Sequence, residues 1–257
     1  MNVKKTKLSN QSGFTLVEMA IVLVIIGLIL GAVSIGKDLQ RDAEYAKVKQ
    51  KFIDQWASAY NAYYQRAGVV LGDDETRPQI MVNGEEYILG NPPSGGDMRS
   101  ILVSAICEGI NQPLGLTRPV VSGLHTYFDD LGIRMPPGRA EGSEDRYVYL
   151  DTNGNPQEVQ VCFGWNPPET AWGSGNMMII SGITPDLARA LDQMIDGKPD
   201  AQEGMFRRQD VDDGIAGGPG VEWAETNRDR FGTGPNDNSN LDENAIVTVV
   251  AYYKMNQ

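Results

Sequence analysis

The sequence of 257 residues predicts an α+β protein, in which one long N-terminal helix covers an antiparallel sheet. The first observation is that no proline occurs from Phe14 to Ala67, so one helix of roughly 80 Å can run through both. The second is a series of short apolar runs in residues 68–257, separated by Gly, Asn and Pro, which is typical of strands joined by turns. The third is that half of the long helix is amphipathic and can supply a layer to the sheet.

Residues 14–36 form the apolar half of the long helix. No charged residue occurs from Met19 to Gly36, and a helix of that length spans roughly 27 Å, close to the thickness of a bilayer's hydrocarbon core. Three lysines precede it in residues 1–13, and lysines beside a membrane span stay on the cytoplasmic side. The sequence therefore predicts one membrane span, with everything after Gly36 outside the cytoplasm.

Residues 37–67 form the amphipathic half of the helix. Apolar or small residues recur there at alternating steps of three and four, with one miss at Gln50. Gly68 is well placed to end the helix as a left-handed cap. We interpret the aromatic residues of this stripe as core that packs on a head domain, not as a cofactor site. The predicted buried stripe consists of Leu39, Ala43, Ala46, Ile53, Trp56, Tyr60 and Tyr63.

Residues 68–257 are long enough to bury a core of their own, and we expect them to form a globular head domain. Turn residues between apolar runs predict two hairpins, one turning at Asn83–Gly84 and one at Thr152–Asn155. A helix is expected from Asp97 to Gly109, and a second from Thr184 to Gly197 with Pro185 at its first position. Further strands are predicted in the runs NMMIIS (176–181) and AIVTVVAYYK (245–254).

The composition favours no nucleic-acid partner and no enzyme. The net charge is −12, and the acidic excess lies in the head domain, which would repel phosphates. The chain has a single histidine, His125, and no Gly-x-Ser-x-Gly turn. Neither of its two cysteines, Cys107 and Cys162, has an obvious basic partner that would activate it as a nucleophile. If the head is exported, those two cysteines have the alternative of a disulfide that closes a long loop.

Glu18 is the one charged residue in the apolar half, and three interpretations of it compete. A secretory signal peptide needs a basic start, an apolar middle and a small-residue cleavage site, which Ala32–Ser34 supplies. A plain membrane anchor would keep the Glu18 carboxylate near the interface and in reach of water. In the third interpretation a cut between Gly13 and Phe14 creates a new α-amine, which pairs with Glu18 on a neighbouring copy. The amphipathic helix beyond Gly36 argues against the first, because a cut near Ser34 would separate the helix from its start.

The stretch GFTLVEMAIVLVIIGLIL, residues 13–30, resembles the N-terminus of type IV prepilins and type II secretion pseudopilins. These proteins have a short basic leader that ends in Gly, then Phe, then Thr-Leu-Val-Glu, then an apolar helix, and the likeness covers about residues 4–36. The resemblance implies a pilin-like fold with a leader over residues 1–13. It also implies cleavage after Gly13 by a prepilin peptidase, N-methylation of Phe14, and a contact between Glu18 and the amine of the adjacent subunit.

The same resemblance implies a function. We expect a structural subunit of a type IV pilus or a secretion pseudopilus, held in the inner membrane with a periplasmic head before it assembles with other pilin subunits. Its expected partners are a prepilin peptidase, a platform protein and an ATPase motor in the membrane. The alternative is a periplasmic binding protein or enzyme that uses the helix only as a tether.

Calcium is the one cofactor that the sequence leaves open. Asp151, Asn153 and Asn155 occupy alternate positions, as the oxygen ligands of calcium do in an EF-hand loop. Such a loop also needs Gly and Glu at two later positions, where this chain has Pro156 and Cys162. A plain hairpin turn explains the three polar residues as well. Another set of acids lies at the end of a predicted helix and in the turn after it, at Asp192, Asp196 and Asp200. Pseudopilins similar to this family bind calcium in a C-terminal loop, and the matching candidates here are Asp237, Asn238, Asn240, Asp242 and Glu243.

Overall fold

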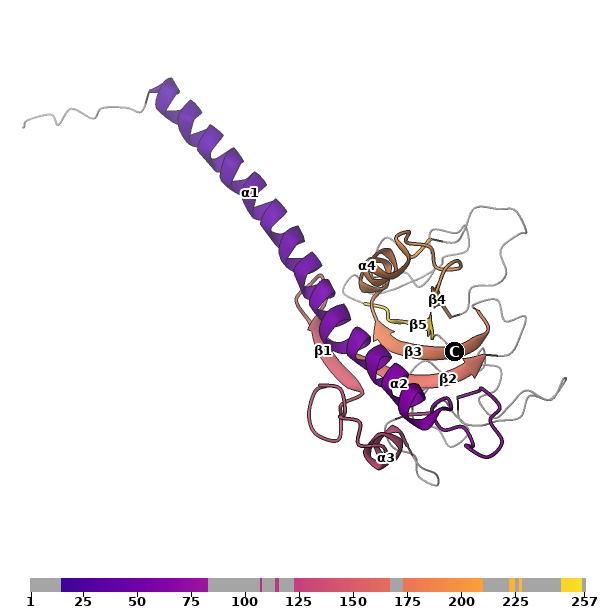
Figure 1. Ribbon diagram of the computed structural model, residues 1–257. Helices are drawn as coiled ribbons and strands as arrows, with labels where there is room; N and C mark the ends of the chain where they lie inside the picture. The colour runs from indigo at the N-terminus through magenta and orange to yellow at the C-terminus, as the bar shows by residue number, and fades with distance from the viewer. Residues whose placement is uncertain are drawn as a thin grey trace, which may run out of the picture. The chain divides into compact units, whose positions relative to one another are not determined.

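The computed structural model describes residues 15–82, 107, 114–115, 123–166, 173–209, 222–224, 227 and 246–255 (Figure 1). The chain divides into two compact units, residues 1–42 and residues 43–257. The leader, the hairpin predicted at Asn83–Gly84 and nearly all of the helix predicted from Asp97 to Gly109 lie outside the described residues.

The predicted long helix is present and continuous from Leu16 to Ala67. It consists of α1 (Leu16–Val48), a π-helical turn η1 (Lys49–Ile53) and α2 (Asp54–Ala67). It ends as the sequence predicts, because Gly68 adopts a φ of 77° and donates its N–H to the carbonyl of Tyr64.

The π-helical turn was not predicted, and it corrects the predicted stripe. The N–H of Asp54 bonds to the carbonyl of Lys49, five residues back, so the helix holds one extra residue at this point. Each residue of an α-helix turns it by about 100°, and the buried stripe upstream of the π turn is therefore shifted by one position. Tyr45 and Val48 are buried, whereas Leu39 and Ala43 are exposed. Gln50, the one residue that does not fit the predicted apolar spacing, lies within the π turn, where that spacing is interrupted.

The described part of the head contains a five-stranded antiparallel sheet with the order β1-β2-β3-β5-β4. The hairpin predicted to turn at Thr152–Asn155 is confirmed by the first two strands, and the final strand is confirmed but begins at Val249. The three-residue edge strand β4 was not predicted. The strands are β1 (Arg146–Leu150), β2 (Pro156–Asn166), β3 (Gly175–Ile183), β4 (Phe206–Arg208) and β5 (Val249–Lys254).

Gly182 lies where the pairing of β3 with β5 slips by one residue, between Ile180 and Ile183. Its φ is +78°, and a Cβ at this position would lie 2.1 Å from the backbone oxygen of Glu158 on β2. Only glycine meets both demands at once, namely a left-handed backbone and an approach closer than any side chain permits.

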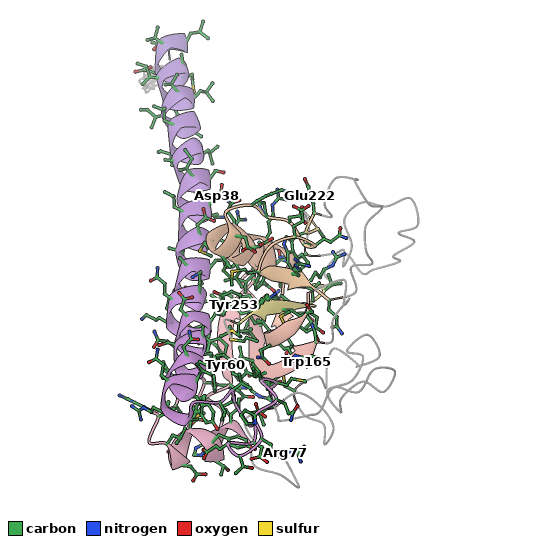
Figure 2. All side chains as sticks on the ribbon, turned by 45° about the vertical axis from the view of Figure 1, so that its right-hand side comes forward. Asp38, Tyr60, Arg77, Trp165, Glu222 and Tyr253 are labelled. Atoms are coloured by element: carbon green, nitrogen blue, oxygen red, sulfur yellow. A yellow bond between two sulfur atoms is a disulfide. The ribbon has the colours of Figure 1, made fainter. Side chains whose placement is uncertain are left out.

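The aromatic stripe of the helix packs on one face of the sheet, as predicted. The Tyr60 ring stacks on Phe163 of β2 with centroids 5.3 Å apart, and Trp56 lies 6.2 Å from the same ring. Figure 2 shows Tyr60 and Tyr253 of β5 within the layer between helix and sheet, where Tyr60 belongs to the main core and the partly buried Tyr253 packs against it. The opposite face has a smaller apolar cluster, formed by Cys107, Cys162, Met177, Ile179, Val250 and Tyr252.

Two shorter helices complete the described head. The helix α4 (Pro185–Asp196) confirms the prediction, with Thr184 as N-cap residue, Pro185 in the first turn and Gly197 in the left-handed conformation at its end. The helix α3 (Leu124–Asp130) was not predicted. It buries Leu124 and Phe128, and the Phe128 ring lies 6.0 Å from Trp56.

Candidate assembly and processing site

The apolar half of α1 presents its side chains on all sides. The most apolar 18-residue window has a mean hydropathy of 2.8 and none of it is buried, so the helix is long and apolar enough to cross a membrane. Leu16, Leu23 and Leu28 are each about two thirds exposed or more. A soluble monomer does not leave such a surface in water, because each buried leucine is worth about 2 kcal/mol. This surface requires lipid or other protein around it.

Glu18 lies in the first turn of α1 and exchanges hydrogen bonds with Thr15. Its Oε2 accepts from the Thr15 backbone N–H at 2.8 Å and from the Thr15 hydroxyl at 2.9 Å. In return the Glu18 N–H donates to Thr15 Oγ1 at 3.2 Å. This reciprocal pair is a capping box, which satisfies backbone donors at the start of a helix. The sequence signal is Thr-x-x-Glu before an apolar run, and none of the three interpretations of Glu18 included this local role.

The capping box occupies one oxygen of the Glu18 carboxylate. No described residue donates to the other oxygen, Oε1, which leaves it available to a cationic group outside the molecule. Gly13 and Phe14, which the prediction makes the cleavage-site residue and the methylated terminus, lie outside the described residues.

The structure joins Cys107 to Cys162 in a disulfide, with Cα atoms 5.6 Å apart and a sequence separation of 55. Cys162 is fully buried on β2, on the face that points away from α2. The bond therefore ties Cys107 to the far face of the sheet. Disulfides form in oxidising compartments, which agrees with a head outside the cytoplasm.

The first calcium candidate, Asp151 with Asn153 and Asn155, forms the turn between β1 and β2. Asp151 Oδ1 accepts from the backbone N–H groups of Asn153 and Asn155 at 2.8 and 2.9 Å. Its Oδ2 accepts from the Gln157 amide at 2.9 Å. Both oxygens of Asp151 thus hold the β1–β2 turn in shape.

The acids at the end of α4 accept hydrogen bonds from N–H groups of the chain. Asp192 accepts from the Trp223 indole and the Asp200 N–H, both at 2.7 Å. Asp196 accepts from the N–H groups of Met205 and Phe206, both at 2.9 Å. Among the described residues no three His, Cys, Asp or Glu side chains are placed to hold a metal ion. The remaining calcium candidates, Asp237, Asn238, Asn240, Asp242 and Glu243, lie outside the described residues and stay a prediction.

Burial raises the pKa of Asp192 from its usual 3.8 to about 7, against the lowering effect of its two hydrogen bonds. Sequence patterns gave no sign of its contact with Trp223, 31 residues away. His125 lies on the surface of α3, where its Nδ1 is 2.8 Å from Asp129 Oδ2, so it belongs to a surface pair.

A family model for the prokaryotic N-terminal methylation motif matches residues 8–34. The matched range holds Gly13, Phe14 and Glu18, with most of the apolar half of α1. No curated protein and no solved structure matches the chain. The motif supports the resemblance to prepilin and pseudopilin-type proteins, and a long apolar helix followed by an antiparallel sheet is consistent with a pilin-like fold.

Proposed function

We propose that this protein is a structural subunit of a type IV pilus or of a type II secretion-like pseudopilus. A prepilin peptidase removes residues 1–13, the new amino terminus on Phe14 is methylated, and the apolar helix moves from the membrane into a filament of pilin-like subunits. The subunit has no catalytic task of its own.

The observation that carries this proposal is the position of Glu18 within the methylation motif. It begins an apolar helix that is exposed on every side, and it keeps one carboxylate oxygen without a described donor. A carboxylate in an apolar surrounding is costly unless a positive group compensates it. The amine of Phe14 on an adjacent subunit is such a group, and it exists only after cleavage.

Further partners follow from the same proposal. Extraction of the helix from the membrane requires a platform protein and an ATPase motor. The head is periplasmic before assembly, and the disulfide between Cys107 and Cys162 supports that location.

The first experiment determines the amino terminus of the protein purified from its host, by mass spectrometry of the intact chain. We expect N-methylated Phe14. A chain that begins at Met1 indicates a simple membrane tether for a periplasmic binding protein or enzyme, and a chain that begins near Gly36 indicates an ordinary secretory signal. Either of these results rejects the proposal.

The second experiment separates the charge of Glu18 from its capping role. In Glu18→Gln the side chain still accepts from Thr15, because Gln serves in a capping box as Glu does, but the charge is lost. The matched control Thr15→Ala keeps the charge and removes the hydroxyl of the box.

We expect Glu18→Gln to insert in the membrane normally and to be lost from sheared filaments, by tenfold or more in an immunoblot. We expect Thr15→Ala to be incorporated better than Glu18→Gln. If Glu18→Gln is incorporated normally and Thr15→Ala is not, capping explains Glu18, and pairing between subunits does not.

A further inference from the structure

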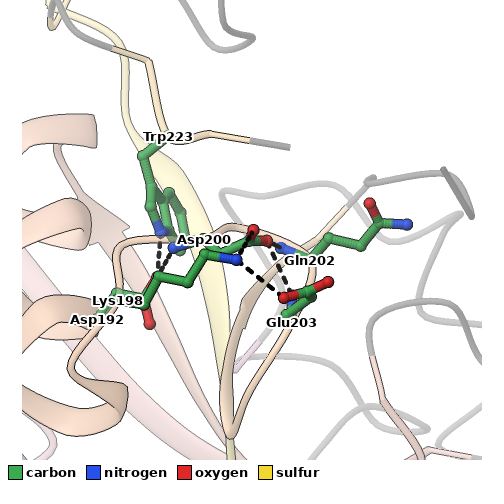
Figure 3. Close-up of polar contacts among 6 residues, drawn as sticks. All are labelled: Asp192, Lys198, Asp200, Gln202, Glu203 and Trp223. Carbon is green, nitrogen blue, oxygen red and sulfur yellow. Dashed lines mark hydrogen bonds and ion pairs between the residues drawn. The ribbon is translucent and has the colours of Figure 1, made fainter. Parts of the chain in front are cut away.

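Asp192 is a fully buried carboxyl group that joins three parts of the late chain. It lies on α4, and its Oδ2 accepts from the backbone N–H of Asp200, which belongs to the turn after the helix. The same oxygen accepts from the indole N–H of Trp223, which lies in the separate segment Glu222–Ala224. Figure 3 shows both donors directed at Asp192.

The second oxygen of this carboxyl group has a different surrounding. Asp192 Oδ1 is buried and accepts no hydrogen bond from a described residue. Asp196 lies one helical turn further on the same face of α4, and its carboxylate is held by the N–H groups of Met205 and Phe206. An ionised Asp192 would thus be a buried charge with one unsatisfied oxygen and a like charge beside it.

Protonation removes both difficulties. A neutral Asp192 carries its proton on Oδ1, where it can donate toward the Asp196 carboxylate, and Oδ2 keeps its two donors. The Trp223 ring is buried against Phe206 at 5.7 Å and its N–H lies against the Asp192 carboxyl group, so the docked segment helps to keep water from that group. The indole hydrogen bond by itself favours the ionised form, but burial is the larger influence and favours the neutral form. The docked position of the segment Glu222–Ala224 and a neutral Asp192 therefore favour each other.

We propose that Asp192 is a proton-controlled clasp, which holds the Trp223 segment against α4 when it is protonated and loosens that segment when it is ionised. Burial raises the pKa of this group to about 7, so the change falls near neutral pH. The proton comes from solvent, and the clasp needs no other ligand.

The charged and titratable groups around Asp192 do not reverse the direction of its pKa shift. On α4 the nearest is Asp196, which raises the pKa of Asp192. In the following turn Asp200 is paired with Lys198 at 3.2 Å, and Lys198 also binds Glu203. The β4 strand carries Arg207, whose Nε donates to the carbonyl of Gly204, and the buried Arg208. From β5, Tyr253 faces Asp196 and has a raised pKa, so it stays neutral.

The pH window follows from the raised pKa. Between about pH 4 and pH 7 the folded protein binds a proton at Asp192 that the unfolded chain has released. The free energy of unfolding therefore falls as the pH rises through this window, and the contribution of Asp192 is constant above it.

The first test measures the thermal midpoint of the full chain in detergent micelles from pH 4 to pH 9. Asp192→Asn mimics the protonated form, because the amide oxygen accepts from Trp223 and Asp200 and the amide N–H₂ donates toward Asp196. We expect the variant to lose the fall in midpoint seen in the wild type toward pH 8 and to be the more stable protein there. The matched control Asp151→Asn, at a buried acid with a comparable set of donors, should keep the wild-type profile.

A second measurement follows the clasp directly. The indole ¹⁵N–H resonance of Trp223, assigned by its loss in Trp223→Phe, should titrate with a midpoint near 7 in the wild type and not in Asp192→Asn. Trp223→Phe removes one donor to the ionised form, so its stability profile should shift to a higher pH midpoint even if Asp192→Asn fails to fold. An indole resonance that does not titrate from pH 4 to pH 9, or an unshifted profile in Trp223→Phe, overturns the proposal.

Discussion

Cys162 and Phe163 are consecutive residues of β2, and their side chains lie on opposite faces of the sheet. Phe163 receives Trp56 and Tyr60 from the long helix, and Cys162 forms the disulfide to Cys107. Side chains alternate along a strand, so a slip of one residue in the register of β2 would exchange the two roles. The register of β2 therefore determines both which side chain meets the long helix and which side chain forms the disulfide.

Phe163→Ala should destabilise the head by about 4 kcal/mol, because it leaves a cavity beneath two aromatic rings of α2. Chemical unfolding followed by circular dichroism in detergent measures this loss. Tyr64→Ala on the exposed side of the same helix is the matched control, with an expected change within about 0.5 kcal/mol. Equal effects of the two substitutions would show that α2 does not pack on β2.

Removal of the disulfide should cost about 4 kcal/mol, the loop-closure entropy expected for the 55-residue separation. The double variant Cys107→Ser, Cys162→Ser measures it by the same unfolding experiment. The chain has only these two cysteines, so the native protein should not react with a thiol reagent in denaturant until it is reduced. Two reactive thiols before reduction would contradict the bond.

Gly182→Ala should destabilise the head by more than about 2 kcal/mol, because its methyl group would meet the Glu158 oxygen as well as strain the backbone. Gly154→Ala separates these effects, since Gly154 has a similar φ of +81° with open space around it. The control should lose about 1 kcal/mol, the usual cost of a left-handed backbone for a residue with a Cβ. A comparison of their urea midpoints tests whether the close approach between β3 and β2 exists.

Deletion of Gln50 should convert the π turn into a regular α-helix and rotate everything upstream by about 100°. Tyr45 and Val48 would then leave the core, and the hydrogen bond from the Tyr45 hydroxyl to Asp186 on α4 would be lost. We expect a clear fall in the thermal midpoint. Deletion of Asp42, upstream of Tyr45, keeps the register of both residues and should leave the midpoint unchanged. A stable Gln50 deletion would show that the π turn is dispensable.

Much of this fold could be predicted because strong local signals agree with it. The helix end at Gly68, the turn before β2, and the Thr184-Pro185 start of α4 each depend on the conformational preference of one or two residues. The apolar runs of β3 and β5 are also unambiguous. Local signals of this kind act over a few residues and need no knowledge of the tertiary structure.

The features that the sequence did not predict depend on contacts with distant parts of the chain or lack a strong local signal. The helix α3 has glycine as its N-cap residue and no side-chain cap, and β4 has three residues that pair only because β5 lies beside them. The contact between Asp192 and Trp223 depends on the whole late chain being folded. The π turn left a trace at Gln50, but a single break in a period does not reveal which way the register moves.

The first deeply buried residue of the long helix is Tyr45. Among the described residues, the core of the head is built from Tyr45 onward, and the apolar half of α1 supplies no residue to it. In the proposed assembly the apolar half of α1 can exchange contacts with lipid for contacts with the helices of other subunits. The head domain does not have to refold for this exchange. The free energy of polymerisation and the free energy of folding are then separate quantities, which can be altered by mutation one at a time.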